Sequence, residues 1–273
     1  MAARESLPMV ASRVFQPGRD ALVAALLLLS SGTMSFAAAA IAAVGTADDW
    51  SKQPVKVACV GASITQGMWA TPDHDYPTQL QEMLGPGFHV GNFGRAGTTA
   101  LHKGRFLNDR KLLFNERAFG WSSYQLTGEF KKALAFKPDI VVIQFGANDS
   151  KDYNWGMHSQ EMKADVEDLI HNFETLDSHP KVYLMLPPPL YHDGMYGMNA
   201  TVIRQALPSV LIEVTKSKGL PPPVDVLGAF LERCPIRGSW EYCDLMSADG
   251  CHPNDAGYHL LAEVVQAAIT ATE

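Results

Sequence analysis

The 273-residue chain has little positive charge to offer a polyanion. Its 22 Lys and Arg residues are outnumbered by 29 Asp and Glu residues, which gives a formal net charge of -7 at pH 7. A broad positive field is what holds phosphate backbones or anionic lipid to a protein surface. The composition therefore argues against a nucleic-acid partner.

Cysteine is also scarce: the chain has four, and none has the C-x-x-C spacing of a zinc site, so we expect no metal. Cys59 lies in a predicted buried strand and is expected to be a free core thiol, since free cysteine is readily buried. Cys234, Cys243 and Cys251 fall in one irregular stretch, where any two of them could be bridged, and the sequence does not choose the pair. A bridge from Cys251 would stiffen this stretch and make it sensitive to reduction.

Charge is missing altogether from residues 21–45, which follow three arginines within the first 19 positions. An order of basic, apolar and small residues is typical of a secretory signal peptide, so we expect residues 1–46 to be a signal and the protein to be secreted or in the secretory pathway. The uncharged stretch also reaches the length of a membrane span. An uncleaved signal-anchor, which would bring the protein to a membrane, and an organellar transit peptide stay open as alternatives.

Beyond residue 46, short apolar runs alternate with helical patterns, without an internal repeat or an interior linker. This alternation predicts βαβ units and a parallel sheet covered by helices on both faces. We expect one α/β domain over residues 47–273, a three-layer α/β/α sandwich with a five-stranded, mainly parallel sheet. Pro208 should break or kink the fourth helix. The expected strands are 55–60, 88–93, 139–145, 181–186 and 224–227, and the expected helices are 76–84, 126–136, 159–176, 198–218 and 254–270.

Two small-residue stretches follow the first two strands, at the sheet edge where such folds bind ligands. Ser63 stands in Gly61-Ala-Ser63-Ile-Thr-Gln-Gly67, where a sharp turn could expose its hydroxyl. An ordinary helix N-cap is the other interpretation, and the stretch lacks the G-x-S-x-G spacing of an α/β-hydrolase elbow. Gly97 follows the second strand, where a glycine either lets a backbone N–H approach a ligand or makes a plain turn.

Two polar groups follow later strands. Asn148 comes after the most strand-like segment, and its side-chain amide could donate to an oxyanion or form an Asx-turn. Asp249 and His252 lie three residues apart, just before the last helix. Histidine suits proton transfer near neutral pH, and a nearby carboxylate can orient it. Taken alone, the pair could equally be a turn cap and an ordinary loop histidine.

Together these groups resemble the SGNH (GDSL-like) hydrolase family, whose blocks carry a serine, a glycine, an asparagine and a histidine in this order. The family also has an aspartate three residues before the histidine. The resemblance covers essentially all of residues 55–270, implies a flavodoxin-like fold, and is closest to the acetylesterase-type branch. The first block reads Gly-Ala-Ser-Ile here and not Gly-Asp-Ser-Leu. That departure weakens the subfamily assignment but leaves the nucleophile in place.

The resemblance implies a serine esterase that forms an acyl-enzyme and needs no cofactor. Ser63 would be the nucleophile, His252 the base, and Asp249 the acid that orients the base. The backbone N–H groups of Ser63 and Gly97, with the Asn148 side chain, would form the oxyanion hole.

The resemblance favours O-acetyl groups on carbohydrates as substrate, and an exported location fits a polysaccharide or glycoconjugate. A lysophospholipase, thioesterase or broad short-chain esterase is the alternative, and a catalytically silent glycan-binding protein is one of another class. Aromatic side chains on the expected mouth loops could stack on sugars, although ordinary packing explains them as well. Trp155 and His192 are our candidate substrate contacts. The other mouth aromatics are Trp69, Trp121, Tyr153, Tyr191 and Tyr196.

Overall fold

The computed structural model describes residues 53–106 and 120–271. The chain divides into two units, Met1–Ser51 and Lys52–Glu273. The predicted signal peptide or signal-anchor, residues 1–46, lies outside the described residues. Within the described part, no helix has both the length and the apolar character needed to cross a membrane.

A four-stranded parallel sheet with the order β2-β1-β5-β6 forms the middle layer of the described residues. Counting only these strands, the order is 2-1-3-4, as in flavodoxin-like sheets. All residues of β5 are buried, as expected for a strand covered on both faces. The strands are β1 (Val55–Gly61), β2 (Phe88–Gly94), β5 (Ile140–Gln144) and β6 (Lys181–Leu184).

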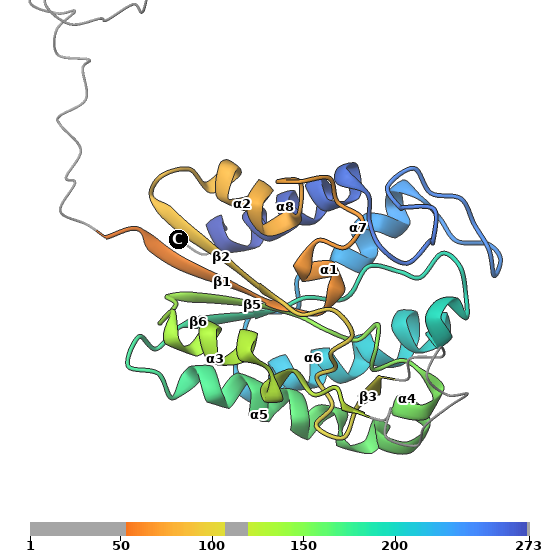
Figure 1. Ribbon diagram of the computed structural model, residues 1–273, viewed down its shortest axis with the longest axis horizontal. Coiled ribbons are helices and arrows are strands. Elements are labelled where there is room, and N and C mark those ends of the chain that lie inside the picture. The colour runs from red at the N-terminus through yellow and green to blue at the C-terminus, as the bar shows by residue number, and fades with distance from the viewer. Residues whose placement is uncertain (1–52, 107–119, 272–273) are drawn as a thin grey trace, which may run out of the picture. The chain divides into compact units, whose positions relative to one another are not determined.

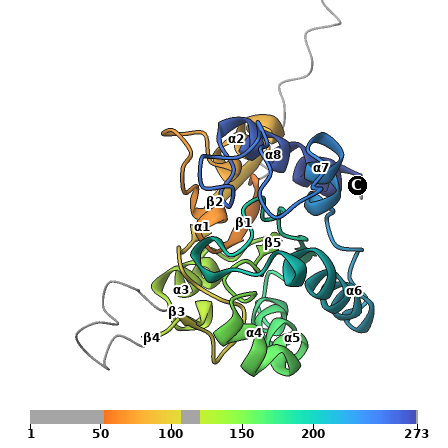
Figure 2. The ribbon, with the colours of Figure 1, turned by 90° about the vertical axis from the view of Figure 1, so that its right-hand side faces the viewer.

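Helices cover both faces of this sheet, which confirms the predicted three-layer α/β/α class (Figure 1). Successive residues of β1 contribute to different cores: Val57 and Cys59 to one, Ala58 and Val60 to the other. Cys59 is free and buried, as predicted, and burial raises the pKa of its thiol to about 12. One face carries α2 (Tyr76–Leu84), α7 (Val226–Arg233) and α8 (Asp255–Thr270), and the other carries α3 (Gly128–Ala135), α5 (Met162–Glu174) and α6 (Leu207–Lys218) (Figure 2).

The expected fifth strand, 224–227, is wrong. Val224 forms a single parallel bridge with Met185, and α7 begins two residues later. The cause is local: the side chain of Asp225 accepts a hydrogen bond from the Gly228 N–H at 2.7 Å and caps the helix. A good N-cap outweighs the β-branched pattern of so short a segment.

The predicted irregularity at Pro208 takes the form of a widened, π-helical turn over Val202–Ala206, directly before α6. Pro208 occupies one of the first two positions of α6. Proline fits there because the N–H groups of a helix's first turn need no partner within the helix.

Some short elements were not predicted from the sequence. They include α4 (Asp152–His158) and a two-stranded antiparallel ribbon of β3 (Arg105–Phe106) and β4 (Gly120–Trp121). Single 3₁₀ turns span Tyr124–Leu126, Ser159–Glu161 and Met195–Gly197. These elements have no clear hydrophobic period, because they are too short to show one.

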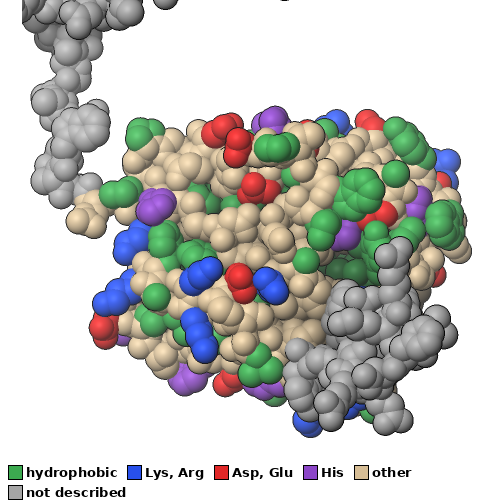
Figure 3. All heavy atoms as spheres, viewed as in Figure 1, with side chains coloured by type: hydrophobic (Ala, Val, Ile, Leu, Met, Phe, Trp, Pro, Cys, Tyr) green, Lys and Arg blue, Asp and Glu red, His purple; other side chains and the backbone are tan. Residues whose placement is uncertain are grey.

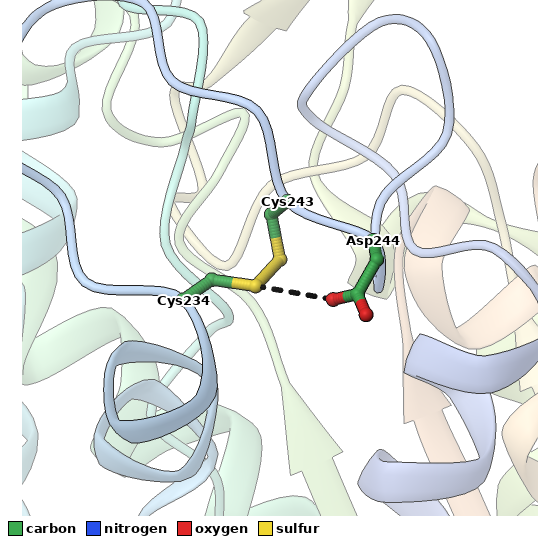
Figure 4. Close-up of side chains that lie close together, drawn as sticks. All are labelled: Cys234, Cys243 and Asp244. Atoms are coloured by element: carbon green, nitrogen blue, oxygen red, sulfur yellow. Dashed lines mark hydrogen bonds between the residues drawn. A yellow bond between two sulfur atoms is a disulfide. The ribbon is translucent and has the colours of Figure 1, made fainter.

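A disulfide joins Cys234 to Cys243, with a Cα–Cα distance of 5.6 Å (Figure 4). Cys251 is free and buried, so among the pairings that the sequence left open the structure forms the one without Cys251. Asp244 Oδ1 lies 3.5 Å from Cys234 Sγ, but the bonded sulfur carries no proton to donate. These three residues cluster closely enough to suggest a metal site. The two sulfurs are not thiolates, the form that ligates metals, so the set does not fit an ion.

Gly94 ends β2 where the strand passes against the short helix α1 (Ser63–Gln66). A Cβ at Gly94 would come closer than 3.0 Å to backbone atoms of Gln66 and Thr65, which cannot yield without displacing α1. We expect Gly94→Ala to lower the free energy of unfolding by about 1–3 kcal/mol, measured by urea titration. Gly156→Ala is the control, because nothing lies within 4 Å of its Cβ and the change should stabilise α4 by about 0.5–1 kcal/mol. Equal stabilities of the two variants would contradict this packing argument.

Candidate active site

Ser63 is the first residue of α1, directly after β1. The turn between them is tight: a Cβ at Gly61 would collide with the Gln144 carbonyl and the Thr65 side chain. Helix α1 is capped by Gly67, which adopts a left-handed conformation with φ 89°. The glycines thus allow a tight turn from β1 into α1 and an immediate end to this short helix. Ser63 therefore lies at the carboxyl edge of the sheet.

The structure brings Ser63, His252 and Asp249 together. His252 Nε2 lies 2.9 Å from Ser63 Oγ, and His252 Nδ1 lies 2.7 Å from Asp249 Oδ2. All three residues are buried. An imidazole linking a hydroxyl to a carboxylate can take the hydroxyl proton and activate the oxygen as a nucleophile. The residues predicted as nucleophile, base and orienting acid therefore have the geometry that these roles require.

The Asp249 carboxylate also holds the loop that carries His252. Its Oδ1 accepts the Cys251 N–H at 2.8 Å, the His252 N–H at 2.9 Å and the Ser247 hydroxyl at 2.8 Å. Burial alone would raise the pKa of Asp249. The hydrogen bonds from His252, Cys251 and Ser247 outweigh it and hold the pKa well below its ordinary value. The carboxylate is therefore ionised and able to stabilise a protonated imidazole.

Tyr196 is a further member of this group that the sequence indicated only as a mouth aromatic. Its hydroxyl donates to Asp249 Oδ2 at 3.2 Å, and its ring centroid lies 6.0 Å from that of His252. Burial, and then the charge of Asp249, raises the pKa of Tyr196, so the hydroxyl keeps its proton. Tyr196 has a φ of 54°, a left-handed conformation that is uncommon for a bulky residue. The flanking Gly194 and Gly197, which also have positive φ, were the available sequence signal.

The loop with Gly97 is tied to α1 and to Asn148. Arg95 N–H donates to the Gly61 carbonyl at 2.9 Å, and Ala96 N–H donates to Gln66 Oε1 at 2.7 Å. Asn148 is buried, and its Nδ2 donates to the carbonyl of Thr98, the residue after Gly97, at 3.0 Å. Asn148 Nδ2 carries a second N–H. The amide thus lies beside the loop that holds the other predicted oxyanion donor.

Asp149 was not predicted as part of the site, yet it fixes the same loops. It is fully buried, its Oδ1 accepts the Leu101 N–H at 2.9 Å, and its Oδ2 accepts the Gly146 N–H at 3.0 Å. Burial raises the pKa of Asp149 to about 6 despite these hydrogen bonds. This carboxyl group joins the end of β5 to the loop after β2 and so sets the position of Asn148.

The two predicted substrate contacts have different surroundings. Trp155 lies on α4, partly buried against the hydrophobic core on the α5 and α6 face. Its side chain takes no part in the contacts described above around Ser63. His192 lies next to the loop of Asp249 and His252, with its ring against Gly250 and stacked on Trp240. Among the other predicted mouth aromatics, Tyr191 is buried, Trp69 and Tyr196 are exposed, and the side chain of Trp121 lies outside the described residues.

Asp149 should give stability a distinct pH dependence. Its folded-state pKa of about 6 exceeds the ordinary value of 3.8, so the folded state binds a proton more readily between these values. The stabilisation from this group is thus fully present below about pH 4 and is lost as the pH rises to about 6.

Asp149→Asn removes this titration and sets an NH₂ group against a backbone N–H donor, which costs about 1–3 kcal/mol. At pH 4 wild type should therefore exceed the variant in free energy of unfolding, measured by urea titration. The difference should shrink from about pH 4 to pH 6 and then stay constant. A difference independent of pH would mean that Asp149 titrates normally.

Comparison with known proteins finds a matching family model and a curated relative. The model of the GDSL-like lipase/acylhydrolase family matches residues 59–260. The acetylxylan esterase of Xylanibacter ruminicola is 33% identical over 234 residues, which are 79% of this chain and 43% of that protein. The chain thus spans less than half the length of this curated relative.

Solved structures share the fold. A carbohydrate acetylesterase from Sinorhizobium meliloti is 18% identical with a TM-score of 0.58, covering 80% of this chain and 100% of its own. A lipase/acylhydrolase from Enterococcus faecalis is 26% identical with a TM-score of 0.53, covering 80% of this chain and 96% of its own. The family model spans well over half of the sequence and ends ten residues before the end of α8. The chain therefore belongs to the GDSL-like lipase/acylhydrolase family of hydrolases.

Proposed function

We propose that the protein is a serine esterase that removes O-acetyl groups from carbohydrates. The observation that carries this proposal is the chain of contacts from Ser63 Oγ through His252 to Asp249, at 2.9 Å and 2.7 Å. Membership of an acylhydrolase family supports ester chemistry. The likeness to an acetylxylan esterase supports acetyl groups on a glycan as the substrate.

The reaction proceeds in two steps. Ser63 Oγ attacks the ester carbonyl carbon while His252 takes the hydroxyl proton. The bond between that carbon and the sugar oxygen then breaks as His252 returns the proton to the leaving alcohol. An acetyl group then remains on Ser63. Water gives a proton to His252 and attacks the carbonyl carbon of this acetyl-enzyme. The bond from that carbon to Ser63 Oγ then breaks, His252 returns the proton to Ser63 Oγ, and acetate leaves. Asp249 stays ionised throughout and stabilises the imidazolium; the chemistry calls on no metal or organic cofactor.

The negative charge that develops on the carbonyl oxygen needs donors at a fixed position. Ser63 contributes its backbone N–H, which has no acceptor within the helix because it lies in the first turn of α1. Gly97 contributes a second N–H, from a residue with φ 81°. Asn148 contributes the side-chain N–H that Thr98 does not use. Such preorganised donors are often the largest single contribution to catalysis.

Longer acyl esters are the second candidate substrates. The family is described as lipases and acylhydrolases, and the Enterococcus faecalis structure carries the same description. Rates on p-nitrophenyl acetate and p-nitrophenyl octanoate separate the two candidates, and release of acetate from acetylated xylan and pectin tests the carbohydrate part. Strong preference for octanoate would reject the acetylesterase proposal.

Secretion remains our prediction, with membrane association only if the N-terminal segment is uncleaved.

Ser63→Ala should lower kcat on p-nitrophenyl acetate by at least about 10⁴-fold, because the nucleophile is lost. An organophosphonate should label wild type at Ser63 and leave the variant unlabelled. Ser209→Ala, on the exposed side of α6, is the matched control and should behave like wild type. If wild type binds acetylated glycans but hydrolyses no ester, the protein is a silent glycan-binding member of the family.

Asn148→Ala should lower kcat by about 10²–10³-fold with a much smaller change in KM, because the lost donor acts on the transition state. The change also removes the hydrogen bond to Thr98, so urea unfolding of the same variant is measured alongside the kinetics. A folded variant with near-wild-type kcat would exclude Asn148 from the oxyanion hole.

A further inference from the structure

Exposed aromatic side chains of the described residues gather on loops near the candidate active site. These side chains are Trp69, Tyr196 and Trp240, and Tyr242 is exposed on the same segment as Trp240. Tyr196 contacts Asp249 and also interacts with Trp69, which lies two residues beyond Gly67, the C-cap of α1. Figure 3 shows hydrophobic side chains gathered at the right-hand end of the described surface, with histidine and acidic side chains between them.

Trp240 is exposed and yet held in place. It is 63% exposed, and its ring stacks on that of His192 with centroids 4.1 Å apart and an interplanar angle of 16°. The two backbones form an antiparallel bridge, with Asp193 N–H donating to the Ser239 carbonyl at 2.9 Å. One face of the indole is thus covered by His192, while the side chain keeps most of its surface open to a ligand.

His192 connects this indole to the catalytic loop. A Cβ at Gly250 would collide with the His192 ring, and Tyr191 N–H donates to the Gly250 carbonyl at 2.8 Å. Gly250 directly follows Asp249 in the chain. The His192 Nδ1 atom is buried and has no hydrogen-bond partner among the described residues. The His192 ring therefore lies between Trp240 and the loop that carries His252.

The segment that carries Trp240 is closed by the disulfide between Cys234 and Cys243. The hydroxyl of Tyr191 donates to the Cys234 carbonyl at 2.9 Å, and Glu241 N–H donates to the Tyr191 carbonyl at 3.0 Å. Both ends of this segment are therefore tied to the residue that precedes His192. A ligand-binding surface fixed in advance loses little conformational entropy when the ligand binds.

We propose that Trp240, stacked on His192, is a subsite for a sugar ring of an oligomeric or polymeric substrate. This sugar is not the acetylated one, which lies at Ser63. The C–H groups on one face of a sugar ring are apolar and weakly positive, and they pack against the electron-rich face of an indole. The inference rests on the proposed carbohydrate esterase function.

The geometry favours a chain over a single sugar. Trp240 is separated from His252 by the His192 ring and by the backbone of the catalytic loop. Because the His192 ring and the loop of His252 lie between, we expect an acetylated monosaccharide with its ester at Ser63 to leave Trp240 free, whereas a glycan chain continues past His192 to the indole. Trp240 thus selects for substrate length, without touching the reacting atoms.

The test compares kcat/KM on acetylated xylan with kcat/KM on p-nitrophenyl acetate, which is too small to reach Trp240. In Trp240→Ala the ratio of the two should fall about 5–20-fold, mainly through KM on the polysaccharide, since one aromatic contact is lost. Trp240→Phe keeps an aromatic face and should lose less. Tyr242→Ala is the matched control: it removes an 88% exposed aromatic from the same loop and should keep the wild-type ratio.

The outcomes separate this inference from the proposed function. An unchanged ratio in Trp240→Ala, or an equal fall in Tyr242→Ala, overturns the subsite. So does an equal loss by Trp240→Ala on p-nitrophenyl octanoate, because the indole would then serve an acyl chain. Wild type that cleaves p-nitrophenyl acetate but no acetylated polysaccharide overturns the subsite and leaves an esterase. Wild type that cleaves no ester rejects the proposed function itself. Thermal unfolding of each variant excludes misfolding as the cause of a loss.

Discussion

The buried carboxylate of Asp249 is the group on which the rest of the candidate site depends. A buried charge is tolerated only when it is fully hydrogen-bonded. Here Oδ1 takes two backbone N–H groups and a hydroxyl, while Oδ2 takes His252 Nδ1 and the Tyr196 hydroxyl. These hydrogen bonds to the Asp249 carboxylate fix the conformation of the loop, the orientation of the His252 imidazole and the position of Tyr196. The distance from His252 to Ser63 follows from that loop.

A second buried carboxylate, Asp149, does the same on the other side of the site. It binds backbone N–H groups of Leu101 and Gly146 and so joins two loops at the end of the sheet. The pKa values of the two carboxyl groups are shifted in opposite directions. Asp249 has stronger donors, which include an imidazole, and its pKa is lowered, whereas burial raises the pKa of Asp149 to about 6. Ser63 and the predicted oxyanion donors thus stand between two loops that are each held by a carboxylate.

The rim of the site consists of the disulfide-closed segment with Trp240 and of His192. It contributes none of the proposed catalytic residues. The disulfide-closed segment with Trp240 rests on His192, and His192 rests on Gly250. Rim and catalytic loop therefore form one continuous packed unit. That arrangement links the proposed chemistry at Ser63 to the proposed recognition of a longer glycan, and it assigns His192 a supporting place beneath Trp240.

The sequence by itself determined the layered α/β fold, the buried strands and the order of the serine, glycine, asparagine and histidine groups after them. Periodicity and small-residue turns are local signals, so the sequence alone shows them. The strand predicted over residues 224–227 is wrong, because the helix cap made by Asp225 outweighs a short β-branched run. Only the tertiary structure decided the cysteine pairing, the contact of Tyr196 with Asp249 and the stacking of Trp240 on His192. These pairs join side chains from separate loops, whose relative positions depend on how the whole chain packs.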